Sequence, residues 1–227
     1  MNDIQNAFAE QQMVAKYTEG PPRFVPGYNS MLSMAAILLA ERAHEDARIL
    51  VLGAGGGLEL KAFAQAQPSW TFDGVDPSAP MLDLAGQTLG PLASRAHLHR
   101  GYIDDAPEGP FDGATCLLTL HFVDVEERLR IASEIRRRLK PGAPFVAAHF
   151  SIVGGADERP LWLSRYSAFL AASGVEPDKA VAAQDAVGKR LSILTPEQDE
   201  VILREAGFSD TTLFYTGFTF RGWVAYA

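Results

Sequence analysis

The stretch from Ile49 to Leu60, ILVLGAGGGLEL, decides the fold of this chain. Its first four residues, Ile49–Leu52, form a short apolar run bounded by turn residues, which is typical of a strand buried on both faces. The glycines that follow permit positive φ angles and let the backbone approach a ligand closely. A helix-forming run, Leu58–Gln67, comes next, and its free N–H groups and positive dipole end point back at the same turn. Strand, turn and helix together predict a nucleotide-type cradle at the carboxyl edge of a parallel sheet.

The rest of the chain alternates strand-like and helix-like runs as far as residue 150. This order predicts an α/β fold, doubly wound around a mostly parallel sheet. Two β-rich runs, residues 211–215 and 218–226, come near the C-terminal end, and Thr216-Gly217 between them fits a hairpin turn. We therefore expect a Rossmann-like sheet of seven strands that ends in an antiparallel hairpin. The other strands are expected at residues 70–76, 96–102, 111–123 and 144–150.

Helical segments are expected to cover the carboxyl edge of this sheet. Asn29 or Ser30 can cap a helix early in the chain, because both side chains accept hydrogen bonds from free N–H groups. We expect one domain over residues 1–227, with an N-terminal helical cap at 1–44 and a helical lid inserted at 155–192.

The composition argues against several functional classes. The net charge of −8 disfavours a general nucleic-acid-binding surface, and Arg136–Arg138 is expected to be a solvated helix face. The one cysteine, Cys116, lies in an apolar run and is expected to be buried, so neither an internal disulfide nor a cysteine metal cluster is expected. The apolar run Met31–Ala40 is far shorter than the roughly 20 residues of a membrane span, and no signal peptide is visible. We expect a cytoplasmic protein with no membrane association and no metal site.

The glycine turn narrows the choice of ligand. A dinucleotide fingerprint, G-x-G-x-x-G/A, fails because its sixth position is Leu58, and a Walker loop is absent. The spacing present is G-x-G-x-G, starting at Gly53. The next predicted strand ends in Asp76, where a carboxylate can bind a ribose diol, although this acid can instead cap the helix that follows.

These features, in this order, resemble the class I S-adenosylmethionine-dependent methyltransferases over residues 45–227. An acid closes the second strand, an Asp-rich turn follows the third, the fourth is apolar and Leu-Lys-Pro-Gly precedes the fifth. The resemblance implies S-adenosyl-L-methionine as the cofactor, with the glycine turn along its methionine part and Asp76 on its ribose. It also implies that Tyr102–Asp104 flank adenine and that Leu118–Phe122 lie beneath the sulfonium. The residues assigned to the cofactor in this way are Gly53, Ala54, Gly55, Gly57, Asp76, Pro77, Tyr102, Ile103, Asp104 and Leu118.

A narrower resemblance is to the carboxy-S-adenosylmethionine synthases, which use prephenate and S-adenosylmethionine and supply tRNA wobble-uridine modification. It is carried by RFVPGYNSMLSMAAILLAER, residues 23–42, and by LREAGFSDTTLFYTGFTFRGWVA, residues 203–225. This resemblance implies that Tyr28 contacts the cofactor and that Arg190 grips the extra carboxylate of the product. It also suggests a homodimer.

The chain departs from both families at identifiable positions. The acid that usually stands two residues before the first glycine of the methyltransferases is Val51 here, so the ammonium group of the cofactor must be contacted from elsewhere. The synthase cysteine in the glycine turn is Ala54, its acid in the adenine loop falls at Tyr102, and its asparagine on the fourth strand falls at Leu117. Because a lost polar contact to a buried carboxylate is costly, these changes favour a relative whose chemistry is ordinary methyl transfer or has otherwise changed.

Two histidines and one arginine are candidates for catalysis. Methyl transfer needs an aligned acceptor, and a base only where the acceptor must lose a proton. His121, at the end of the fourth predicted strand, is the best-placed candidate base, although it can equally be a structural histidine. His149 is a weaker candidate, and Arg190 can instead be a solvated charge at a helix end.

The acceptor is expected to be a small molecule. Trp162, Tyr166 and Phe169 recur at helical spacing, which is typical of core packing but could also roof an apolar acceptor pocket. The function that we predict is methyl transfer from S-adenosylmethionine to such an acceptor, with nucleic acid an unfavoured partner. Carboxy-S-adenosylmethionine synthesis is the first alternative, and a non-catalytic cofactor-binding protein is the second.

Overall fold

The strands of the protein form one sheet, in a computed structural model that describes residues 17–227. Within that range the sheet has seven strands in the order β3-β2-β1-β4-β5-β7-β6. The first five are parallel to one another, and β7 runs antiparallel to both β5 and β6. The predicted seven-stranded fold with its terminal hairpin is confirmed. The strands are β1 (Arg48–Leu52), β2 (Thr71–Asp76), β3 (Ala96–Arg100), β4 (Gly113–Leu117), β5 (Pro144–Phe150), β6 (Ser209–Gly217) and β7 (Phe220–Tyr226).

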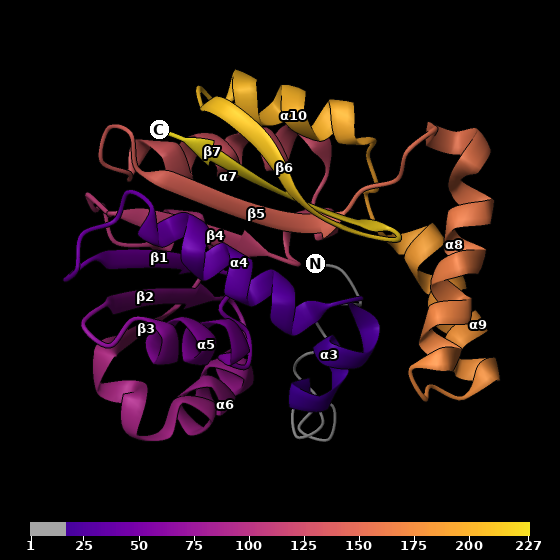
Figure 1. Ribbon diagram of the computed structural model, residues 1–227, viewed down its shortest axis with the longest axis horizontal. Coiled ribbons are helices and arrows are strands. Elements are labelled where there is room, and N and C mark those ends of the chain that lie inside the picture. Colours follow the sequence, from indigo (N-terminus) through magenta and orange to yellow (C-terminus); the bar gives the residue numbers. More distant parts are fainter. Residues whose placement is uncertain (1–16) are drawn as a thin grey trace.

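Helices cover both faces of the sheet (Figure 1). Helices α4, α5 and α6 lie on one face, whereas α7 and α10 lie on the other. Helices α8 and α9 pack against each other at one end of the sheet, where the lid was predicted. The first part of the predicted N-terminal cap, residues 1–16, lies outside the described residues. The α-helices are α3 (Gly20–Phe24), α4 (Tyr28–Ala40), α5 (Leu58–Ala66), α6 (Ala79–Leu89), α7 (Val125–Arg137), α8 (Gly155–Ala172), α9 (Pro177–Arg190) and α10 (Pro196–Glu205).

Strand β1 shows why a continuous apolar run indicated a central strand. Ile49 and Val51 belong to the apolar layer beneath α4 and α5, whereas Leu50 and Leu52 belong to the layer beneath α7 and α10. Successive side chains of a strand point to opposite faces, so a strand covered on both faces has no polar position. Each fully buried aliphatic side chain of this kind contributes about 1.5–3 kcal/mol relative to an exposed one. Cys116 of β4 is buried in the second layer, as predicted.

Several helix and strand ends differ from the sequence prediction. Strand β3 ends at Arg100 rather than at residue 102, and β6 continues to Gly217, which pairs with Phe220, so the hairpin turn lies at residues 218–219 and the prediction of Thr216-Gly217 is wrong.

Strand β4 ends at Leu117, well before residue 123, because Leu118 adopts φ 58° and the chain turns into the short 3-10 helix η4 (Leu120–Phe122). Helix α4 begins at Tyr28, with Gly27 in a left-handed conformation at its N-cap. Neither Asn29 nor Ser30 is therefore the cap. Three further 3-10 segments are η1 (Tyr17–Glu19), η2 (Gly90–Arg95) and η3 (Ile103–Asp105).

A buried polar cluster joins α7, α10 and β5. Arg128 is 1% exposed, and its Nη1 donates to Asp199 Oδ1 at 2.5 Å while its Nη2 donates to the Ser192 carbonyl at 2.6 Å. His149 Nε2 lies 3.0 Å from the same Asp199 oxygen. Burial by itself would raise the pKa of Asp199, but His149 and Arg128 together hold it below its ordinary value. The cluster ties the chain that leaves α9 to the body of the protein.

Within residues 17–227, no helix has the length and apolar character that crossing a membrane requires.

Candidate functional site

A cavity of about 600 Å³ opens at the carboxyl edge of the parallel strands. Its walls come from the glycine turn after β1, the ends of β2 and β4, the segment from η1 to α4, and α8. Most residues assigned to the site from the sequence meet here. Those that line the cavity are Tyr28, Gly53, Ala54, Gly55, Asp76, Pro77, Tyr102, Ile103, Leu118 and His121.

The glycine turn is held against the end of β2. The backbone N–H groups of Gly53 and Ala54 donate to the Val75 carbonyl at 2.8 and 3.1 Å, and that of Gly55 donates to Asp76 Oδ2 at 2.9 Å. Gly53 has φ 79°, and a Cβ there would lie 2.1 Å from Oγ1 of Thr119. No side chain can occupy that position, so the turn presents bare backbone to the cavity, as a close-lying ligand requires.

Asp76 has free accepting capacity toward the cavity. Oδ2 accepts from Gly55, and Oδ1 accepts from the Ser78 N–H group at 2.9 Å. Each carboxylate oxygen has a second lone pair, so two ribose hydroxyls can still be bound. Burial raises the pKa of Asp76, and the two backbone hydrogen bonds oppose that rise. Ser78, rather than Asp76, is the N-cap of α6, so the alternative of Asp76 as a helix cap is wrong.

Three residues assigned to the cofactor stand outside the cavity walls formed by the described residues. Gly57 has φ 79° at the start of α5, and a Cβ there would lie 2.8 Å from the Ala85 Cα atom, so it serves helix packing. Asp104 is exposed and accepts from Arg130 Nη1 at 2.8 Å, a hydrogen bond that lowers its pKa. Arg190 is an exposed residue at the end of α9.

His121 faces the cavity as a neutral ring. It lies on η4 after the end of β4 and is 4% exposed. Burial lowers its pKa well below the ordinary value, with smaller effects from His149 and Arg128. Its Nδ1 accepts from the Phe150 N–H group at 3.3 Å, so the proton of the neutral ring lies on Nε2. In this tautomer Nε2 is a hydrogen-bond donor, and action as a base would require the opposite tautomer. The weaker candidate, His149, lies in the Arg128–Asp199 cluster instead.

Aromatic side chains form the part of the cavity beyond His121. Phe150 of β5 contacts Tyr166 of α8 edge-on, with ring centroids 5.3 Å apart, and Phe220 of β7 at 4.1 Å. All three line the cavity, so one member of the predicted aromatic stripe on α8 does roof it. Tyr28 also lines the cavity and is buried, and burial raises its pKa well above the ordinary value, with smaller effects from Tyr17 and Glu59.

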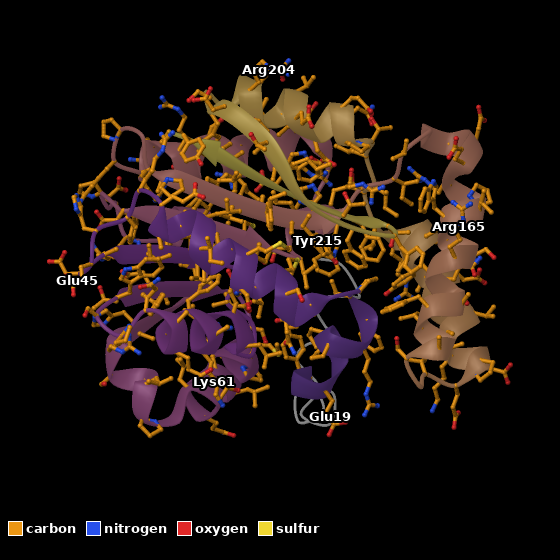
Figure 2. All side chains as sticks on the ribbon, in the orientation of Figure 1. Glu19, Glu45, Lys61, Arg165, Arg204 and Tyr215 are labelled. Carbon is orange, nitrogen blue, oxygen red and sulfur yellow. The ribbon has the colours of Figure 1, made fainter. Side chains whose placement is uncertain are left out.

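The turn ahead of Tyr28 is fixed by the C-terminal hairpin. The Tyr215 hydroxyl donates to the Pro26 carbonyl, and Tyr215 lies centrally in the view of Figure 2. The segment that leads into α4 is therefore tied to strand β6 of the C-terminal hairpin.

Among the lining residues that were not predicted from the sequence, Tyr17 and Glu59 carry titratable groups beside the glycine turn. Tyr17 lies over the glycine turn, and burial raises its pKa to about 12, with smaller effects from Asp76 and Glu59. Glu59, in the first turn of α5, is 6% exposed, and the Thr115 hydroxyl donates to its Oε1. Helical spacing could have found Glu59, because it precedes the core residue Phe63 by four positions. Burial raises its pKa to about 8.

Glu59→Gln is expected to stabilise the unliganded protein increasingly as the pH rises. The folded-state pKa of Glu59 is raised to about 8 from 4.5, so the folded state retains a proton that the unfolded state loses. Stability therefore falls between these two pH values in the wild type. The unfolding temperatures of both proteins at about pH 5 and about pH 8 test this, and an equal gap at the two pH values would contradict it.

Comparison with known proteins agrees with this geometry. Residues 49–142 match a family model described as a methyltransferase domain. The carboxy-S-adenosyl-L-methionine synthase of Chromohalobacter salexigens is 25% identical over 230 residues, covering 100% of this chain and 85% of that protein. The synthase of Actinobacillus succinogenes is 26% identical over 208 residues, covering 89% and 86%.

Solved structures share the fold. A putative O-methyltransferase from Nostoc punctiforme superposes with a TM-score of 0.69 at 21% identity, covering 96% of this chain and 59% of that one. Human N-acetylserotonin methyltransferase in complex with SAM gives 0.65 at 16% identity, covering 98% and 58%. This chain thus spans little more than half the length of these two proteins. The [4+2]-cyclase SpnF gives 0.67 at 18% identity, covering 92% and 73%. The predicted resemblance to class I S-adenosylmethionine-dependent methyltransferases, and to carboxy-S-adenosylmethionine synthases among them, is confirmed.

Proposed function

We propose that this chain is an S-adenosylmethionine-dependent methyltransferase that acts on a small molecule with an apolar body. The observation that carries the proposal is the continuity of one cavity, which joins the glycine turn and Asp76 to the aromatic wall of Phe150, Tyr166 and Phe220. S-adenosyl-L-methionine as the cofactor, predicted from the sequence, is supported by the family match and by the curated relatives.

The residues present fit this cofactor. At Gly53 a Cβ would collide with Thr119, Gly55 has a positive φ of 47° that favours glycine, and Asp76 keeps lone pairs for a ribose diol. When bound, the cofactor supplies a methyl group made electrophilic by its sulfonium. The chain contributes mainly position, since holding two reactants in line converts a bimolecular step into one that is effectively unimolecular.

The acceptor side of the cavity can orient a molecule with one polar end. Phe150, Tyr166 and Phe220 pack against an apolar body and exclude water. His121 carries a proton on Nε2 and can donate it in a hydrogen bond to an acceptor oxygen or nitrogen. His121 would then position the acceptor through a hydrogen bond.

The arginines of α7 are engaged within the protein. Arg136 donates to the Gly207 carbonyl at 2.6 Å, and Arg137 pairs with Glu108 and Glu134. Arg138 is 2% exposed and bonds to Glu134, so the expectation of a solvated face at this residue is wrong. These pairings support a small acceptor over a nucleic acid.

Carboxy-S-adenosylmethionine synthesis is the second candidate, because the curated relatives carry that name over nearly the whole chain. That product bears an additional carboxylate, which needs a cationic or hydrogen-bonding partner in its pocket. Arg190 is exposed at the end of α9, and Leu117 is apolar. These placements favour methyl transfer.

Incubation with S-adenosylmethionine and prephenate is expected to give no carboxylated cofactor by mass spectrometry. A panel of small aromatic and aliphatic acceptors, assayed for S-adenosylhomocysteine, is expected to give turnover with at least one member. A carboxylated cofactor that disappears in Arg190→Ala would establish the synthase instead. Tight cofactor binding with no product from either assay would favour the non-catalytic alternative.

A further inference from the structure

Glu59 lines the cavity directly beside the glycine turn. It follows that turn at the start of α5, lines the cavity and is 6% exposed. The Thr115 hydroxyl donates to Oε1. Thr115 is the register partner of Val51 on the neighbouring strand, so the carboxylate of Glu59 lies over the sheet position beside Val51.

Among the described residues, the other two carboxylates that line the cavity, Asp76 and Glu127, have other roles: Asp76 is assigned to the ribose, and Glu127 has a cationic partner. Asp76 accepts from two backbone N–H groups. Glu127 pairs with Arg130, whose Nη2 lies 2.7 Å from Glu127 Oε1. Among the ion pairs of residues 17–227, none includes Glu59, and the side-chain hydrogen bond that it accepts there comes from the Thr115 hydroxyl to Oε1. The cavity therefore holds a buried acid that has no cationic partner among residues 17–227.

A buried carboxylate without a cation is costly, which is why burial raises the pKa of Glu59 to about 8. A ligand cation that donates N–H bonds to Oε2 would remove this cost. The sulfonium has no N–H group, whereas the ammonium group of the methionine part has three. The glycine turn that precedes Glu59 is the part of the cavity assigned to that end of the cofactor.

We propose that Glu59 binds the ammonium group of S-adenosylmethionine, from helix α5, in place of the acid that is absent at Val51. The assignment rests on the proposed function, since it takes S-adenosylmethionine as the ligand. It identifies Glu59 as the residue that distinguishes ligands with a free amine from those without one.

Calorimetry with three ligands tests this assignment on Glu59→Gln, which keeps an oxygen for the Thr115 hydroxyl. S-adenosylmethionine and its decarboxylated form both retain the ammonium group, and their affinities are expected to fall about ten- to a hundredfold. 5′-Methylthioadenosine lacks the whole amino-acid part, and its affinity is expected to change less than about twofold, because no charge-assisted hydrogen bond is lost.

Three outcomes separate the two proposals. Equal weakening of all three ligands, or unchanged binding of S-adenosylmethionine, would overturn the role of Glu59. Failure of the wild-type protein to bind S-adenosylmethionine at all would overturn the proposed function itself. The thermal unfolding of the variant, compared with the wild type, shows that the protein tested is folded.

Proton release gives a second measurement that does not depend on catalysis. With a pKa of about 8, Glu59 carries a proton at about pH 7 in the free protein and would lose it to pair with an ammonium group. Titrations in buffers of different ionisation enthalpy are expected to show roughly one proton released per ligand by the wild type and none by Glu59→Gln. Equal release by both proteins would contradict the assignment.

Discussion

Replacing Arg128 with alanine is expected to lower the free energy of unfolding by about 3–5 kcal/mol. The side chain is 1% exposed, and its removal leaves Asp199, which is 2% exposed, without its charged partner. It also removes the hydrogen bond to the Ser192 carbonyl, which fixes the chain as it leaves the lid helices. Urea unfolding followed by circular dichroism measures the loss.

The double variant Arg128→Met, Asp199→Leu separates the charge from the packing. Replacing both members of a buried pair by apolar residues is often neutral or stabilising, so this variant is expected to recover most of the lost stability. If Arg128→Ala and the double variant lose equal free energy of unfolding, the loss comes from altered packing and not from the unpaired charge of Asp199. An Arg128→Ala loss below about 1 kcal/mol would contradict the predicted role of the cluster.

Asp76→Ala is expected to weaken cofactor binding by about a hundredfold or more, since hydrogen bonds to a charged group contribute about 1.5–3 kcal/mol each. Two hydroxyl contacts would be lost, together with the Gly55 and Ser78 N–H bonds that hold the glycine turn in place. Calorimetric titration with S-adenosylhomocysteine measures the change.

Asp104→Ala provides a matched control from the loop after β3. Asp104 is also an acid assigned to the cofactor from the sequence, but it pairs with Arg130 on the surface and stands outside the cavity walls. Its replacement is expected to leave the cofactor affinity within about twofold of the wild-type value, because exposed ion pairs contribute little to stability. Wild-type affinity in Asp76→Ala would show that the ribose assignment is wrong.

The sheet and the glycine turn could be predicted because their signals are local. Ile49–Leu52 is apolar at every position. A strand needs this pattern when helices cover both faces of its sheet. Gly53 needs a left-handed backbone and has no room for a Cβ, so its residue type follows from the turn itself. Asp76 stands one residue beyond Val75, whose carbonyl holds that turn.

The remaining features depend on contacts between distant residues. Arg128 and Asp199 are 71 residues apart, and an arginine on an amphipathic helix gives no sign that it is buried. Strand β4 ends where Leu118 adopts a left-handed backbone conformation. The hydrophobic pattern of a sequence does not predict that conformation in a residue other than glycine. The tautomer of His121 depends on the backbone N–H group of Phe150 in another strand. The role of Arg190 was implied by a family resemblance, which carries no information about which way a helix end faces.

The position of β7 inside the sheet constrains how the protein can be made. Residues 209–227 are translated after every other strand, yet β7 lies between β5 and β6, and Phe220 forms part of the cavity wall. Until the ribosome has released this hairpin, β5 is an open edge and the Pro26 turn lacks its bond from Tyr215. The nascent chain can therefore form the glycine turn and most of its sheet early, but the aromatic acceptor wall stays incomplete until the hairpin emerges.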